Sequence, residues 1–242
     1  MRAAYQGLEG DIIRQHSTGR YLARILAGAA VLALLAGGLW LYARDWAPDR
    51  DVYPTQGVAV SADNGPIDWG TLAANGVDFA YIRAAKGAEG RDPAFARNWS
   101  AARSAGLRYG ASLDFSLCKR AAEQATRFVT TVPRDNAALP PVIRLTLTPA
   151  CAERPERDAV LSELNTLVNL VESNARKPAL LNISPDFEEH YDIASGINRT
   201  LWLEGDFFPP DYATRKWVMW TANDMRHIDG IEGPVRWGVV AP

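Results

Sequence analysis

Residues 57–87 read GVAVSADNGPIDWGTLAANGVDFAYIRAAKG, and this stretch decides the fold. Two apolar runs, Val58–Ser61 and Val77–Ala84, have the composition of β-strands. Between them, Asp68–Asn75 is typical of a short helix. A strand, a helix and a second strand in this order predict a parallel βαβ unit. The stretch therefore predicts the opening of an α/β domain.

The same alternation continues along the chain and then changes. Further helices and strands are expected in turn at Pro93–Ala105, Leu107–Phe115, Ala121–Val132, Pro141–Leu147, Pro155–Asn174 and Ala179–Ile183. After these, short strands near Thr200–Leu203, Trp217–Thr221 and Trp237–Val240 are joined only by loops. About eight strands predict a modified TIM-type (β/α) barrel with fewer helices. In such a barrel the functional residues lie at the C-terminal ends of the strands.

Composition excludes several classes of protein. The chain has 242 residues, of which 48% are hydrophobic, and its formal net charge is −2. A disordered chain would be less apolar, and a nucleic-acid binder would carry a basic excess. Two cysteines are too few for a disulfide-dense mini-protein or a multi-cysteine zinc module. We therefore expect no nucleic-acid partner, no metal and no cofactor.

An apolar segment precedes the barrel. Residues 25–43, ILAGAAVLALLAGGLWLYA, contain no charged side chain and would form a helix about 28 Å long, close to the thickness of a bilayer core. A cleaved signal peptide is the alternative. The run is longer than the apolar region of most signal peptides, and Trp40, Tyr42 and Arg44 interrupt the small residues that a cleavage site needs. The segment therefore predicts a single transmembrane helix that is retained.

The flanking charges predict the orientation of this helix. Four arginines precede it, whereas the two that follow are interleaved with aspartates. The preceding arginines are Arg2, Arg14, Arg20 and Arg24, and the following ones are Arg44 and Arg50. The positive side stays in the cytoplasm. We expect a cytoplasmic segment at 1–24, the span at 25–43, a linker at 44–56 and a barrel at 57–242. The protein would lie in the inner (cytoplasmic) membrane with a periplasmic barrel.

Five segments in order resemble glycoside hydrolase family 25, the lysozyme (N-acetylmuramidase) family. They are Gly57–Gly87, Asp92–Ala111, Gln124–Phe128, Ala138–Thr146 and Asp229–Trp237. The resemblance covers the whole predicted barrel. It implies the same modified barrel fold, and it implies peptidoglycan or another cell-wall glycan as the partner.

The resemblance also implies that the catalytic acids have been replaced. Ala59 stands where the family's G-[IV]-D-[VI]-S pattern has Asp, and Lys86 stands where K-A-T-E-G has Glu. Arg144 and Thr146 stand at the two acids of P-P-V-[LV]-D-[VL]-E, and Arg236 at the Asp of V-D-x-N. Glycoside hydrolysis needs one carboxylic acid and a second carboxylate. The sequence therefore predicts a lysozyme-like domain that does not hydrolyse glycans.

Two interpretations of these replacements stay open. The first is drift after the loss of function. The second is a pocket remade to bind an anion, because guanidinium and ammonium groups are strong donors to anions. The candidate ligand-binding residues are Arg83, Lys86, Asp114, Arg144, Trp220 and Arg236. In this set Trp220 is the candidate for stacking on a sugar ring.

Cys118 and Cys151 follow the third and fourth predicted strands. The loops after neighbouring parallel strands lie on the same face of a barrel. In an oxidising compartment the pair is expected to form a disulfide rather than two free thiols.

Three functions are consistent with this sequence. The first is a membrane-anchored, inactive lysozyme-like domain that binds peptidoglycan or an anionic cell-wall fragment. The second is a muramidase that works with relocated acids such as Asp114, Asp63 or Glu89. The third is a scaffold that contacts other envelope proteins.

Overall fold

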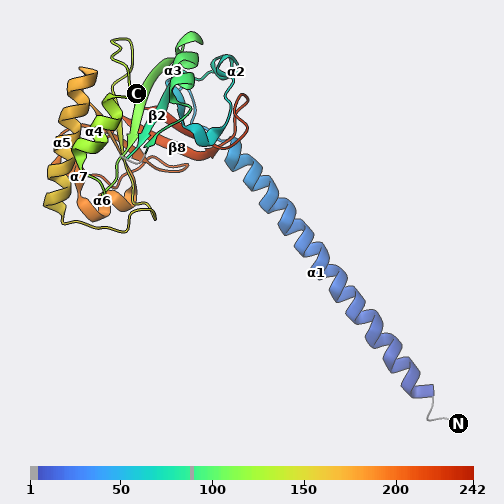
Figure 1. Ribbon diagram of the computed structural model, residues 1–242. Coiled ribbons are helices and arrows are strands. Elements are labelled where there is room, and N and C mark those ends of the chain that lie inside the picture. The colour runs from blue at the N-terminus through green and yellow to red at the C-terminus, as the bar shows by residue number, and fades with distance from the viewer. Residues whose placement is uncertain (1–4, 88–89) are drawn as a thin grey trace. The chain divides into compact units, whose positions relative to one another are not determined.

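The computed structural model describes residues 5–87 and 90–242, with side chains described from residue 21 onward. The chain forms two compact units, Met1–Ala43 and Arg44–Pro242. The first is helical, and the second contains all the strands of the structure (Figure 1).

Helix α1 (Tyr5–Asp45) runs without a break for 41 residues. Its part from Tyr21 to Asp45 is the one helix among the described residues that is long and apolar enough to cross a membrane. Leu32, Leu35 and Leu39 within it are 69%, 64% and 68% exposed. Exposed apolar surface of this extent marks a site of contact with lipid or with another protein. The span predicted at 25–43 lies inside this helix, which begins well before it.

Eight strands close into a barrel. They are β1 (Gln56–Val60), β2 (Phe79–Lys86), β4 (Arg108–Asp114), β5 (Val142–Leu145), β6 (Leu180–Ile183), β7 (Thr200–Glu204), β8 (Met219–Arg226) and β9 (Val235–Val240). Their order is β1-β9-β8-β7-β6-β5-β4-β2, and β1 pairs with β2 to close the ring. Strand β9 is antiparallel to both neighbours, while the other pairs in the ring are parallel. The short β3 (Gly90–Arg91) pairs with β2 outside the ring. The predicted modified barrel of about eight strands is confirmed.

Helices cover only part of this barrel. They are η1 (Ala62–Asn64), α2 (Trp69–Ala74), α3 (Phe95–Ser104), α4 (Ala121–Val129), α5 (Arg157–Ala175), α6 (Pro185–Tyr191) and α7 (Ile193–Gly196). Figure 1 shows α3, α4 and α5 outside the strands. No helix separates β7 from β8 or β8 from β9 in the described chain. The predicted lack of helices in the last part of the barrel is therefore confirmed for the described residues.

Buried side chains form two separate layers, one inside the ring of strands and one around it. The inner layer consists of Phe79, Tyr81, Val142, Leu180, Trp202 and Met219, all buried. The outer layer lies between strands and helices and includes Trp220 and Trp237. Successive residues of a strand point to opposite faces, so each strand contributes to both layers. In the inner layer, the ring centroids of Tyr81 and Trp202 lie 5.3 Å apart.

The segment between α1 and β1 packs against the barrel. Trp46 and Tyr53 contact the outer layer. The Gln56 side-chain amide donates to the carbonyl of Pro48 at 2.9 Å. The Asn223 amide donates to the carbonyl of Trp46 at 3.0 Å. The residues predicted as the linker, 44–56, are thus held on the barrel surface.

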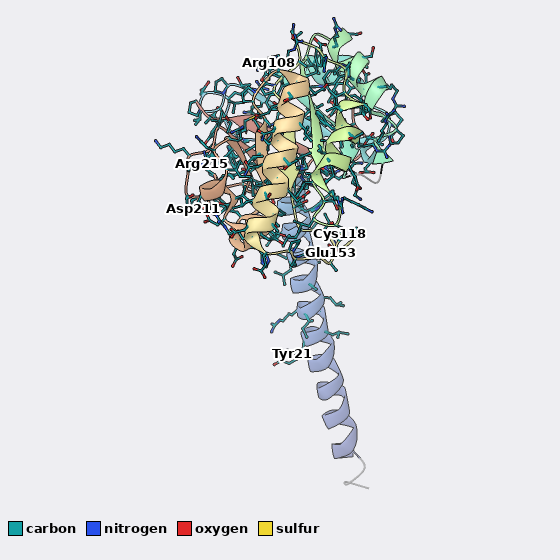
Figure 2. All side chains as sticks on the ribbon, turned by 60° about the vertical axis from the view of Figure 1, so that its left-hand side comes forward. Tyr21, Arg108, Cys118, Glu153, Asp211 and Arg215 are labelled. Atoms are coloured by element: carbon teal, nitrogen blue, oxygen red, sulfur yellow. A yellow bond between two sulfur atoms is a disulfide. The ribbon has the colours of Figure 1, made fainter. Side chains whose placement is uncertain are left out.

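The disulfide joins Cys118 and Cys151, whose Cα atoms are 5.8 Å apart. It connects the loop after β4 to the loop after β5 at the C-terminal ends of these strands. Figure 2 marks this region with Cys118 and Glu153. The bond therefore fixes two loops at the end of the barrel where a site is expected.

Replacing Cys118 and Cys151 together by serine should lower the free energy of unfolding by about 3–4 kcal/mol, because the bond closes a loop with a sequence separation of 33. Urea unfolding of the full chain in detergent, followed by near-ultraviolet circular dichroism, measures the change. Wild type in reductant is the control and should unfold like the variant. A variant as stable as oxidised wild type would contradict the expectation.

Candidate functional site

A pocket of about 240 Å³ lies at the C-terminal ends of the strands. Tyr81, Val142 and Trp202 of the inner layer line it together with polar side chains from several strands. The polar and charged lining of the pocket includes Asp63, Arg83, Asp114, Arg144, Asn182 and Arg236. We call this cavity the central pocket.

Glu204 at the end of β7 joins two of the arginines. Arg236 Nη2 donates to Glu204 Oε1 at 2.6 Å and to Asn182 Oδ1 at 2.9 Å. Arg144 Nε donates to the same Glu204 oxygen at 3.2 Å. Burial lowers the pKa of Arg236, and the nearby Glu204 carboxylate opposes that effect. Since Ala59 lies opposite Arg236 in the β1–β9 register, its small side chain leaves room for the guanidinium.

Arg83 on β2 joins three carboxylates. Its Nη2 donates to Asp63 Oδ2 at 2.8 Å and its Nε to Asp92 Oδ2 at 3.0 Å. Its Nη1 lies 3.7 Å from Asp114 Oδ2. The hydrogen bond from Arg83 lowers the pKa of Asp63, so this carboxyl group stays ionised. The Asp92 side chain is 1% exposed and also accepts from the backbone nitrogens of Ala62 and Ala94.

These ion pairs cancel the positive charge that the sequence predicts. The three arginines do converge on one pocket, but the same lining contains three carboxylates, Asp63, Asp114 and Asp224. Glu204 adds a fourth acid bonded to two of the arginines. Glu204, Asp92 and Asp224 were not among the predicted site residues. The charged lining of the central pocket is therefore close to neutral.

Lys86 and Thr146 lie in an adjoining cavity of about 200 Å³. It shares Arg83, Asp114 and Arg144 with the central pocket. Lys86 ends β2 and is exposed, and Thr146 follows β5 and is half-buried. We call this cavity the side pocket. The structure thus brings together five of the six predicted ligand-binding residues around two connected cavities.

Trp220 is the predicted residue that does not reach the site. It is 1% exposed and belongs to the outer layer, where its ring centroid lies 6.0 Å from that of Tyr53. The next residue, Thr221, points inward, where its hydroxyl accepts from the Trp202 indole nitrogen at 3.0 Å. Trp202 lines the central pocket instead. Strand alternation on β7 places it on the same face as Glu204 and could have identified both.

Glu89, a predicted relocated acid, lies outside the described residues. Burial and the neighbouring Asp224 raise the pKa of Asp206, but Asp206 lines neither pocket. Among the described residues no group of three or more His, Cys, Asp or Glu could hold a metal ion.

Replacing Arg83 by methionine should lower the free energy of unfolding by about 2–3 kcal/mol at pH 7, because it leaves buried Asp92 without its cation. Asp63 has a lower pKa in the folded protein than in the unfolded chain. Its pairing therefore stabilises the fold above about pH 4, and this contribution is lost as the pH falls further. Denaturant unfolding at pH 7 and pH 3 should show a smaller deficit at pH 3.

Arg97→Met is the matched control, since Arg97 is exposed on α3 and makes no ion pair with a described residue. It should change stability by less than about 0.5 kcal/mol. Equal effects of the two substitutions would show that the Arg83 cluster contributes nothing.

Residues 58–231 match the family described as Glycosyl hydrolases family 25. The chain is 30% identical over 196 residues to the Escherichia coli (strain K12) protein called Uncharacterized protein YegX, over 77% of this chain and 70% of that protein. A solved family 25 glycosyl hydrolase from Bacillus anthracis is 27% identical with a TM-score of 0.74, covering 81% of this chain and 92% of the other. A solved bacterial lysozyme from Streptomyces coelicolor shares the fold at 21% identity and a TM-score of 0.68, covering 77% of this chain and 91% of the other. The chain therefore belongs to glycosyl hydrolase family 25.

Proposed function

We propose that this protein is a membrane-anchored, lysozyme-like domain of the cell envelope that binds peptidoglycan without hydrolysing it. The observation that carries the proposal is the ion pairing in the central pocket. The five positions at which the family pattern has acids hold Ala59, Lys86, Arg144, Thr146 and Arg236. Of the carboxylates nearby, Asp63, Asp92 and Glu204 accept hydrogen bonds from arginines.

The chemistry of glycoside hydrolysis explains why this arrangement is inactive. A protonated carboxyl group must give a proton to the leaving oxygen, and a second carboxylate must stabilise or attack a cationic centre. Asp63 cannot supply the proton, since its lowered pKa keeps it ionised. The guanidinium cation of Arg144 would oppose a developing positive charge.

The residues that line the central pocket support binding without cleavage. The central pocket keeps an aromatic floor of Tyr81 and Trp202 and uncharged polar groups from Ser112 and Asn182. Ligand pockets commonly combine such apolar walls with a few polar groups that fix orientation. Membership of a lysozyme family favours a cell-wall glycan as the ligand. The near-neutral charge of this pocket favours an uncharged sugar ring over an anion.

The proposed location rests on α1 and the disulfide. The apolar part of α1 could anchor the chain in the inner membrane, and the arginines before residue 25 favour a cytoplasmic N-terminus. The domain beyond it would then be periplasmic. A disulfide between Cys118 and Cys151 fits such an oxidising compartment.

Hydrolysis by a relocated acid is the second candidate function. Asp114 favours it, because this carboxylate lines both pockets and lies 3.7 Å from Arg83, beyond hydrogen-bonding distance. Asp114 is thus the least constrained acid of the Arg83 cluster. A protein–protein scaffold in the envelope, the third interpretation, needs neither pocket.

The full chain in detergent should co-sediment with purified peptidoglycan sacculi and release no new reducing ends, because the pocket is retained while the acids are replaced. A catalytically active family 25 lysozyme assayed in parallel is the positive control. Release of reducing ends that is lost in Asp114→Asn would establish the relocated-acid enzyme. Failure to sediment with sacculi would contradict the proposed binding function and favour the scaffold.

A further inference from the structure

The side pocket differs in charge from the central pocket that it adjoins. Its lining contains three cationic residues, Arg83, Lys86 and Arg144, and a single acid, Asp114. In the central pocket the lining cations and acids are equal in number. Arg83 and Arg144 are paired with acids, so Lys86 is the cation of the side pocket that makes no ion pair with a described carboxylate.

Two of these cations have donors available for a ligand. Lys86 is exposed and makes no ion pair with a described residue, although its charge contributes to the lowered pKa of Asp63. Arg144 uses Nε for Glu204, and none of the described residues accepts a hydrogen bond from its two terminal nitrogens. Glu204 holds the Arg144 guanidinium through Nε, and Arg144 lines the side pocket.

Hydroxyl groups and a fixed wall complete the side pocket. Ser116, Thr146 and Thr148 line it, and each hydroxyl can donate a hydrogen bond to an anion. Cys151 also lines it, so the disulfide to Cys118 holds the loop that forms this wall. A cavity fixed in this way loses little entropy when a ligand binds.

We propose that the side pocket binds a carboxylate carried by the glycan whose sugar ring occupies the central pocket. This inference rests on the proposed function, and it specifies the ligand as a glycan with a carboxylate-bearing substituent such as a short peptide. Lys86 and the terminal nitrogens of Arg144 are its donors. Asp114 also lines the side pocket, and its carboxylate opposes a second negative charge on the ligand. A monoanionic carboxylate therefore fits this site better than a phosphate dianion.

Binding of soluble fragments to the full chain in detergent tests this assignment by isothermal titration calorimetry. The ligands are a peptidoglycan disaccharide-peptide with free carboxylates, the same fragment with its carboxylates amidated, and an uncharged N-acetylglucosamine oligosaccharide. The free carboxylates should strengthen binding about tenfold over the amidated fragment, the effect of one charge-assisted hydrogen bond.

Lys86→Met should reduce this preference to about twofold or less while leaving affinity for the uncharged oligosaccharide unchanged. Lys86→Arg should retain it, because the cation is kept. Lys216→Met is the matched control, since Lys216 is exposed and lines neither pocket. Near-ultraviolet circular dichroism shows that each variant is folded.

The outcomes separate this inference from the proposed function. Equal affinity for the amidated and free fragments, or a preference that survives in Lys86→Met, would overturn the carboxylate site while glycan binding stands. Absence of binding to all three fragments and to sacculi would overturn both.

Discussion

The central pocket depends on one interaction. In it, the carboxylate of Glu204 is shared between Arg236 and Arg144. Two guanidinium groups inside a closed ring of strands would repel each other and lose hydration. One Glu204 oxygen accepts from both at 2.6 Å and 3.2 Å, and the Asn182 amide oxygen accepts from Arg236 as well. Two cations of the central pocket are thus stabilised by an acid from a different strand.

The rest of the central pocket follows the same rule, because its cations lie beside carboxylates that other segments of the chain contribute. On the opposite side of the pocket, Arg83 holds Asp63, Asp92 and Asp114. A carboxylate in such an ion pair stabilises the fold, because the arginine already balances its negative charge. Aspartate in place of Arg236 alone would put its carboxylate against that of Glu204.

The barrel and its missing helices could be predicted from the sequence, because strand composition and spacing are local properties. The ion pairs could not, since they depend on which strands meet when the ring closes: Arg236 lies opposite Ala59, far apart in sequence, and reaches Glu204 two strands away. The resemblance predicts Arg144 and Arg236 as site residues, whereas Glu204 lies outside the five similar segments. The prediction of Trp220 as a pocket residue neglects the alternation of side chains along a strand. This alternation places Trp220 outward, beside the inward Thr221.

A double-mutant cycle on Glu204→Gln and Arg236→Met, measured as free energies of unfolding, tests most directly whether this pair holds the central pocket together. If the two side chains stabilise each other, the double variant is less destabilised than the sum of the single variants, with a coupling energy of about 1–3 kcal/mol. Effects that add to within about 0.5 kcal/mol would contradict the account, because the arginine would then be held by something other than the carboxylate.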